Sequence, residues 1–137
     1  AVTGSVNQFG IVQPVGGINE KIEGFFQICA ARGLTGTQGV IIPAANVCHL
    51  MLEPPVVAAV REGRFHIWAV RDTDEAMELL TGLPAGKPND KGEVPEGTLN
   101  FHIALQLAEL AQMHQEMLHP THPRKARKKK AAPAKAK

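Results

Sequence analysis

The stretch of sequence that decides the fold reads Pro14-Val15-Gly16-Gly17-Ile18-Asn19-Glu20-Lys21-Ile22-Glu23-Gly24-Phe25-Phe26. A short apolar segment runs into two glycines, and a helical pattern of apolar residues begins directly after them. At about 3.6 residues per turn, one stripe of that helix holds Ile18, Ile22, Phe25, Phe26 and Cys29. The opposite side holds Asn19, Glu20, Glu23 and Gln27. The pattern predicts a strand, a tight glycine turn and a helix over about residues 18–31.

Lys21 belongs to neither side of this helix and lies at the edge of the apolar stripe, in the first helical turn. Partial burial and the positive end of the helix dipole both favour a neutral amine. A neutral lysine amine can act as a general base. Most lysines at such an edge extend their ammonium group into water and have no further role. Position alone therefore leaves a catalytic and a purely structural interpretation open.

The run from Gly10 to Lys21 resembles the proteolytic domain of Lon proteases around its catalytic lysine, where the pattern is Gly-x-Val-x-Pro-(Ile/Val)-Gly-Gly-x-x-Glu-Lys. Thr3-Gly4 before this run, and Gly39-Val40-Ile41-Ile42-Pro43 with Asn46 after it, also fit that family. Residues 1–82 as a whole are similar to the C-terminal part of the Lon proteolytic domain. The run Asn19–Phe26 looks closest to the Lon-like subgroup with a divergent ATPase part. The resemblance implies that Lys21 is the catalytic lysine.

The same resemblance implies an ATP-dependent serine endopeptidase that hydrolyses unfolded or damaged proteins with a Ser-Lys dyad, a variant of the activated-serine arrangement. It implies a homohexameric ring as the assembly. ATP is expected on an ATPase part outside this chain, because the chain has no phosphate-binding glycine-lysine loop. We therefore expect no cofactor and no metal in the chain itself.

The family places its nucleophilic serine about forty residues before the lysine, in a turn of small residues. Only twenty residues precede Lys21, and the one serine, Ser5, matches a strand residue of the family instead. We therefore expect the nucleophile to lie outside this chain and the chain alone to be inactive. Because the first residue is Ala1 and not Met, we expect a fragment, a processed product or the remnant of a decayed gene.

Size and composition favour one globular domain with a modest core, since the chain has 137 residues of which 44% are hydrophobic. No apolar window approaches the length of a membrane span, and no signal peptide pattern is visible. Cys29 and Cys48 are too few for a disulfide framework. These features predict a cytoplasmic protein without a membrane partner, whose two cysteines are reduced core thiols.

The basic residues are concentrated at the end of the chain. Residues 121–137 hold eight of the fifteen basic residues and no acid, which leaves seven basic and thirteen acidic residues before them. Such a Lys-Ala-Pro tract attracts nucleic acid through nonspecific phosphate contacts, and it has no interleaved aromatic residues that would read bases. We favour a solvated tail that aids solubility. The alternative is a noncatalytic interaction or oligomerisation module whose tail binds nucleic acid.

The predicted fold class is mixed α/β (α+β), with an opening β-hairpin followed by alternating helices and strands packed on one sheet, as in Lon-type proteolytic domains. The hairpin is expected at residues 2–6 and 11–15, and later strands at 40–42 and 65–70. One or two helical turns are expected at 44–50, a short helix from Pro54 to about Gly63, and a helix capped by Asp72 and Glu75. The apolar strand 40–42 should lie centrally in the sheet.

Three regions are expected. Residues 1–82 form the C-terminal part of a Lon-type proteolytic domain, residues 83–120 a loop and a long amphipathic helix, and residues 121–137 a disordered basic tail. Thr98 or Asn100 is expected to cap the long helix, which runs to about residue 118. Its apolar stripe is Ile103, Leu107, Leu110 and Met117, with Leu105 and Met113 alongside. This stripe could pack on the body or against a neighbouring subunit.

Two further groups of residues could carry chemistry. The spacing of His102, His114, His119 and His122 does not force these side chains to converge, so no metal site is expected from them. Cys48-His49 has the composition of a thiol nucleophile with its base. Because adjacent side chains rarely point together, a core cysteine is the favoured interpretation.

Overall fold

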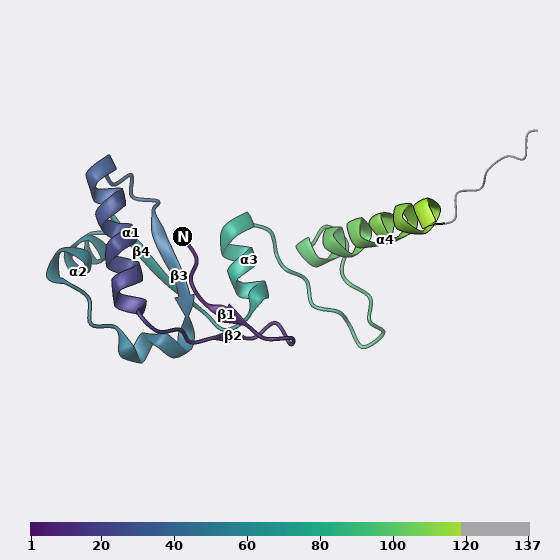
Figure 1. The fold of residues 1–137 in the computed structure, drawn as a ribbon, viewed down its shortest axis with the longest axis horizontal. Coiled ribbons are helices and arrows are strands. Elements are labelled where there is room, and N and C mark those ends of the chain that lie inside the picture. The colour runs from purple at the N-terminus through teal and green to yellow at the C-terminus, as the bar shows by residue number, and fades with distance from the viewer. Residues whose placement is uncertain (119–137) are drawn as a thin grey trace, which may run out of the picture. The chain divides into compact units, whose positions relative to one another are not determined.

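The computed structural model describes residues 1–118, so the predicted tail at 121–137 lies outside the described residues (Figure 1). The chain divides into two units, residues 1–101 and a second unit that begins at His102. The elements are β1 (Ser5–Val6), β2 (Val12–Gln13), α1 (Ile18–Arg32), β3 (Gly39–Pro43), the 3₁₀ helix η1 (Ala44–His49), α2 (Pro54–Arg61), β4 (His66–Val70), α3 (Thr73–Thr81) and α4 (Leu99–Leu118). This mixture of helices and small sheets confirms the predicted fold class.

The central strand of the first unit is β3, which pairs in parallel with β4 from Gly39 opposite His66 to Pro43 opposite Val70. On its other edge, the backbone N–H of Ile41 donates to the carbonyl of Ala1 at 2.8 Å, and Thr3 donates back to Ile41 at 3.0 Å. All five residues of β3 are buried. This confirms the expectation that the apolar strand lies centrally, with neighbours on both sides.

The hairpin forms a sheet of its own, so the expectation of one continuous sheet is not met. The named strands form two sheets of two strands each, β1 with β2 and β3 with β4. Strand β2 ends at Gln13 because Pro14 has no N–H to donate and the backbone N–H of Val15 bonds to the side chain of Asn46. Among residues 1–118, the hairpin is joined to the segment after β4 by an isolated bridge of Ile11 with Asp72 and by the N–H of Val12, which donates to the carbonyl of Arg71.

The core lies where α1 packs against the β3–β4 sheet and α2 (Figure 1). The predicted stripe of α1 is confirmed, with Phe25 partly buried beside its fully buried neighbours. The ring of Phe65 is buried against Phe26 in an edge-on contact with a centroid distance of 5.2 Å. Buried core residues are Ile18, Ile22, Phe26, Cys29, Val40, Ile42, Val56, Ala59 and Phe65. Burial of these apolar side chains is the main favourable contribution to folding.

Helix α3 begins as predicted, because the carboxylate of Asp72 accepts from the backbone N–H of Glu75 at 2.9 Å. The carboxylate of Glu75 accepts from the N–H of Arg71 at 2.7 Å. The capping of α4 by Thr98 or Asn100 stays a prediction, although both side chains make hydrogen bonds at the start of this helix. Thr98 donates its hydroxyl to the carbonyl of Pro95, and Asn100 donates its amide to Asp74 and to the carbonyl of Gly86.

Helix α4 has 20 residues and none of them is buried. Among residues 1–118, no helix combines the length and the apolar character that crossing a membrane requires.

Gly39 is required by the close approach of the two parallel strands. A Cβ atom at this position would overlap the carbonyl of His66 and the ring of Trp68. Gly39→Ala should therefore lower the free energy of unfolding by about 1–3 kcal/mol. The measurement is urea denaturation followed by circular dichroism.

Gly24→Ala is the matched control, since Gly24 lies inside α1 and nothing stands within 4 Å of the place that an added methyl group would take. This change should raise the free energy of unfolding by about 0.5–1 kcal/mol, because alanine loses less backbone entropy in a helix. Equal effects of the two substitutions would contradict the packing described for β3 and β4.

Candidate functional site

The turn before α1 is built by Gly17, which has a φ of 65° and a ψ of 34°. This left-handed conformation is strained for residues with a side chain, so the predicted glycine turn is confirmed. The carbonyl of Gly17 accepts from the backbone N–H of Lys21 at 3.1 Å. Lys21 therefore stands in the first turn of the helix, as the sequence indicated.

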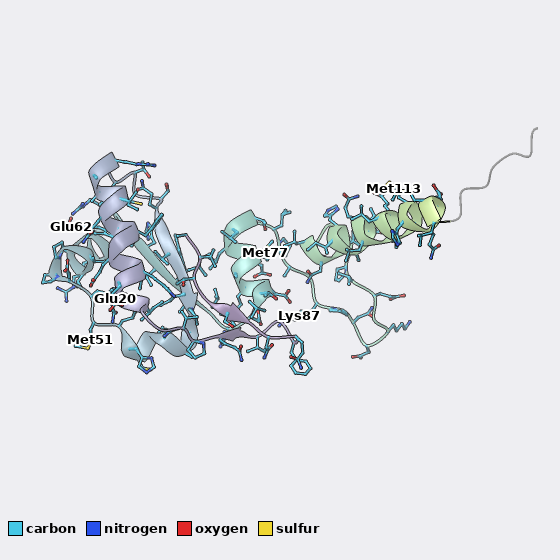
Figure 2. All side chains as sticks on the ribbon, in the orientation of Figure 1. Glu20, Met51, Glu62, Met77, Lys87 and Met113 are labelled. Carbon is cyan, nitrogen blue, oxygen red and sulfur yellow. The ribbon has the colours of Figure 1, made fainter. Side chains whose placement is uncertain are left out.

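The side chain of Lys21 is exposed, although its neighbours Ile18 and Ile22 are buried. The partial burial expected for its amine is therefore not seen among residues 1–118. Figure 2 shows Glu20 in the same turn, and Glu20 is also exposed. The reason is that the core packs against the other side of the helix, along the stripe from Ile18 to Cys29. The first turn of α1 therefore carries an exposed lysine that a group from another segment can reach.

The side chain of Asn46 holds the segment just before the glycine turn. Its side-chain oxygen accepts from the backbone N–H of Val15, and its amide donates to the carbonyl of Val15, both at 3.0 Å. The side chain is 3% exposed, so both bonds are made away from water. Asn46 replaces the strand neighbour that Val15 lacks, and it ties the segment before Gly16 to η1.

Two polar side chains of α1 make contacts that the helical pattern did not reveal. Asn19 donates to the carbonyl of His49 at 3.2 Å and accepts from the N–H of Met51 at 2.9 Å. Glu23 accepts from the N–H of Glu53 at 2.9 Å. Figure 2 marks Met51 in this loop, which follows η1. The side predicted to be simply polar thus holds the loop 49–53 against the helix.

Ser5 lies in β1, opposite Gln13 of β2, and its hydroxyl donates to the side-chain oxygen of Gln13 at 3.3 Å. Ser5 is exposed, and its hydrogen bond joins the two strands of the hairpin. This placement agrees with its interpretation as a strand residue. No imidazole or amine contacts its hydroxyl among the described residues.

Cys48 and His49 depart from the prediction. Cys29 is buried as expected, but Cys48 is exposed, so its interpretation as a core thiol is wrong. Only Asn46 is buried in η1, and a 3₁₀ helix of three residues per turn directs Cys48 away from that side. The sulfur of Cys48 lies 3.7 Å from Nδ1 of His49, so these adjacent side chains do approach each other. Within residues 1–118, no third group orients the imidazole, as a nucleophilic thiol site requires.

No cluster of three or more His, Cys, Asp or Glu side chains suited to a metal ion occurs within residues 1–118. Of the four histidines weighed for such a site, His119 and His122 lie outside the described residues. The absence of a metal therefore stays a prediction.

Two of the cavities among residues 1–118 lie away from the first turn of α1. One, of about 390 Å³, is lined by Phe25, Thr37, Gln38, Trp68 and Leu80 among others. The other, of about 190 Å³, is almost wholly apolar and lies between the hairpin and α3. Neither is lined by Lys21.

Asn46→Ala would leave the partly buried N–H and C=O of Val15 without their partner, and should cost about 1–3 kcal/mol of unfolding free energy for each group. Asn89→Ala is the control, because Asn89 also accepts two backbone N–H groups but is exposed. Thermal and urea denaturation of both variants measure the difference. A loss at Asn46 no larger than the loss at Asn89 would mean that this contact does not hold the turn.

Comparison with known proteins gives three relatives and no matching family model. A protein of Escherichia coli (strain K12) named "Putative Lon protease homolog" is 65% identical over 83 residues, which are 61% of this chain and 14% of that protein. A protein of Haemophilus influenzae with the same name is 56% identical over 82 residues, 60% of this chain and 14% of that protein. The Archaeal Lon protease of Archaeoglobus fulgidus is 33% identical over 91 residues, 66% of this chain and 12% of that protein.

The chain thus spans about a seventh of the length of the first two relatives, and these matches cover about three fifths of the chain. They bear out the resemblance that the run from Gly10 to Lys21 indicated. Over the matched residues, this chain is similar to Lon proteases and their homologs.

Proposed function

We propose that this chain contributes the lysine of a Ser-Lys dyad to a Lon-type serine endopeptidase, and that Lys21 is this lysine. The observation that carries the proposal is the match of Gly10–Lys21 to the Lon pattern, in a chain of which 83 residues are 65% identical to the "Putative Lon protease homolog" of Escherichia coli. The geometry supports it, because Gly17 and Asn46 hold the turn before Lys21 in one conformation. A general base must be positioned within hydrogen-bond reach of the proton that it removes.

The proposed reaction begins when the Lys21 amine accepts the proton of a serine hydroxyl supplied by residues outside this chain. The serine oxygen attacks the peptide carbonyl carbon and forms a tetrahedral intermediate. This intermediate expels the amine half of the substrate, and Lys21 gives that leaving amine the proton. Lys21 next accepts a proton from water, which attacks the acyl-enzyme ester. The carboxylic acid product leaves, and the serine hydroxyl recovers its proton.

The exposed side chain of Lys21 is suited to this arrangement, because its amine is accessible to a serine from another segment. By the same proposal, residues 1–137 alone hydrolyse no peptide. The whole protein would be a cytoplasmic, ATP-dependent enzyme that acts on unfolded or damaged proteins as a hexameric ring, with ATP bound to its ATPase part.

Lys21→Ala, introduced into the protein together with its serine-bearing segment, should reduce hydrolysis of a fluorescently labelled unfolded protein by at least about a thousandfold. Lys21→Arg should fail equally, because an arginine keeps the charge but cannot be deprotonated. Circular dichroism confirms that both variants fold.

Lys87→Ala is the matched control, since Lys87 is exposed in the loop before α4 and far along the chain from the candidate site. It should retain the full rate. Hydrolysis that persists in Lys21→Ala would refute the assignment of the dyad.

A second candidate function rests on the basic tail. Residues 121–137 hold eight basic residues and no acid, which favours nonspecific binding of nucleic acid by a noncatalytic interaction module. In a mobility shift with DNA, binding should fall on the order of a thousandfold between about 50 and 200 mM salt. Deletion of 121–137 should abolish the shift. Binding that survives this deletion would exclude the tail as its cause.

A further inference from the structure

Helix α4 carries many large apolar side chains that are exposed. With 20 residues it is about 30 Å long, and Figure 2 shows its side chains along its whole length, with Met113 labelled. The exposed apolar side chains are Ile103, Leu105, Leu107, Leu110, Met113, Met117 and Leu118. Most of the stability of a helix in a protein comes from packing of its apolar face, so a partner that covers these side chains would stabilise α4.

The apolar residues are not evenly distributed around the helix. At about 100° per residue, one face collects a stripe, defined here as the α4 stripe and made of Ile103, Leu107, Leu110, His114 and Met117. Leu105 falls on the opposite face, so its predicted place alongside the stripe is wrong. Glu109 and Glu116, the charged residues of the helix, also lie off the stripe.

We propose that α4 pairs with the α4 helix of a second copy of this chain through the α4 stripe. Ile103, Leu110 and Met117 repeat every seven residues, and Leu107 and His114 fill the intervening positions with the same repeat. This is the a/d spacing by which two helices interlock side chains along a shared seam. Because the same stripe occurs in each copy, it is self-complementary in the way that a twofold interface requires.

Charge does not oppose pairing with a second copy, and it argues against a membrane surface. The residues that flank the stripe include Ala104, Gln106, Ala111 and Met113, which are uncharged, so pairing opposes no like charges. A membrane surface fits less well, because helices that lie in the lipid interface carry Lys and Arg on their polar face. Helix α4 has no Lys or Arg, and its charged residues are acidic.

The area of the α4 stripe limits the affinity expected for the pairing of two α4 helices. Five exposed side chains and their flanking residues on each of two helices bury a total on the order of 1,000 Å², near the lower limit for a specific interface. The pairing is therefore weak and depends on concentration. It is independent of the proposed peptidase function, because α4 lies beyond residues 1–82, which carry the resemblance to Lon proteases.

The test is sedimentation velocity of the 137-residue chain over a range of concentrations, starting well below micromolar. The mass should rise from that of a 14.7 kDa monomer towards at least twice that value. The double variant Leu107→Glu, Leu110→Glu places carboxylates in the α4 stripe and should weaken association at least about a hundredfold.

Leu105→Glu is the matched control, because Leu105 is 52% exposed, close to the 55% of Leu110, but lies on the opposite face. It should associate as the unchanged chain does. Fluorescence of Trp68, the one tryptophan, checks that residues 1–101 stay folded in each variant.

A chain that remains monomeric at about 100 μM would overturn the proposal. Its dissociation constant would then be higher than an interface of this area supports. Equal weakening by the stripe variant and by Leu105→Glu would also overturn it, since the contact would then not be specific to the stripe. An oligomer that persists in the stripe variant would overturn it too, because other residues, such as those of a Lon-type ring, would then form the contact.

Discussion

The bidentate bond between Asn46 and the backbone of Val15 is the contact on which the rest of the candidate site depends. Val15 follows a proline and precedes two glycines, so no strand neighbour satisfies its N–H and C=O. A buried backbone group without a partner is costly, and Asn46 removes this cost while it fixes where the chain enters α1. Because Asn46 stands on η1, directly after β3, the central strand and the turn before Lys21 form one unit.

This constraint explains why a lysine in the first helical turn can stay in place while its amine faces outward. Gly17 sets the direction of the helix, and the stripe from Ile18 to Cys29 anchors it to the core. Asn19 and Glu23 then hold the following loop on the polar side. The backbone at Lys21 is thus supported by contacts that do not involve its side chain, and the amine is left available for another group.

Local sequence patterns predicted the features of the fold that depend on interactions between residues close together in the chain. The apolar stripe of α1, the glycine turn, the proline start of α2 and the Asp72 cap follow from periodicity and backbone chemistry. The contacts of Asn19 with His49 and Met51 join residues about thirty positions apart, and no periodicity encodes them. The prediction for Cys48 is wrong for the same reason, because its exposure depends on which residue of η1 the distant Val15 binds.

The exposed position of Lys21 also bears on how the base would be activated. An amine accepts the proton of a serine hydroxyl only in its neutral form. A segment that brought a serine hydroxyl to the first turn of α1 would exclude water from the same place, and loss of water favours the neutral amine. One packing event would then supply the nucleophile and prepare its base. A rigid turn with an open lysine is the part of such a site that can form before that segment arrives.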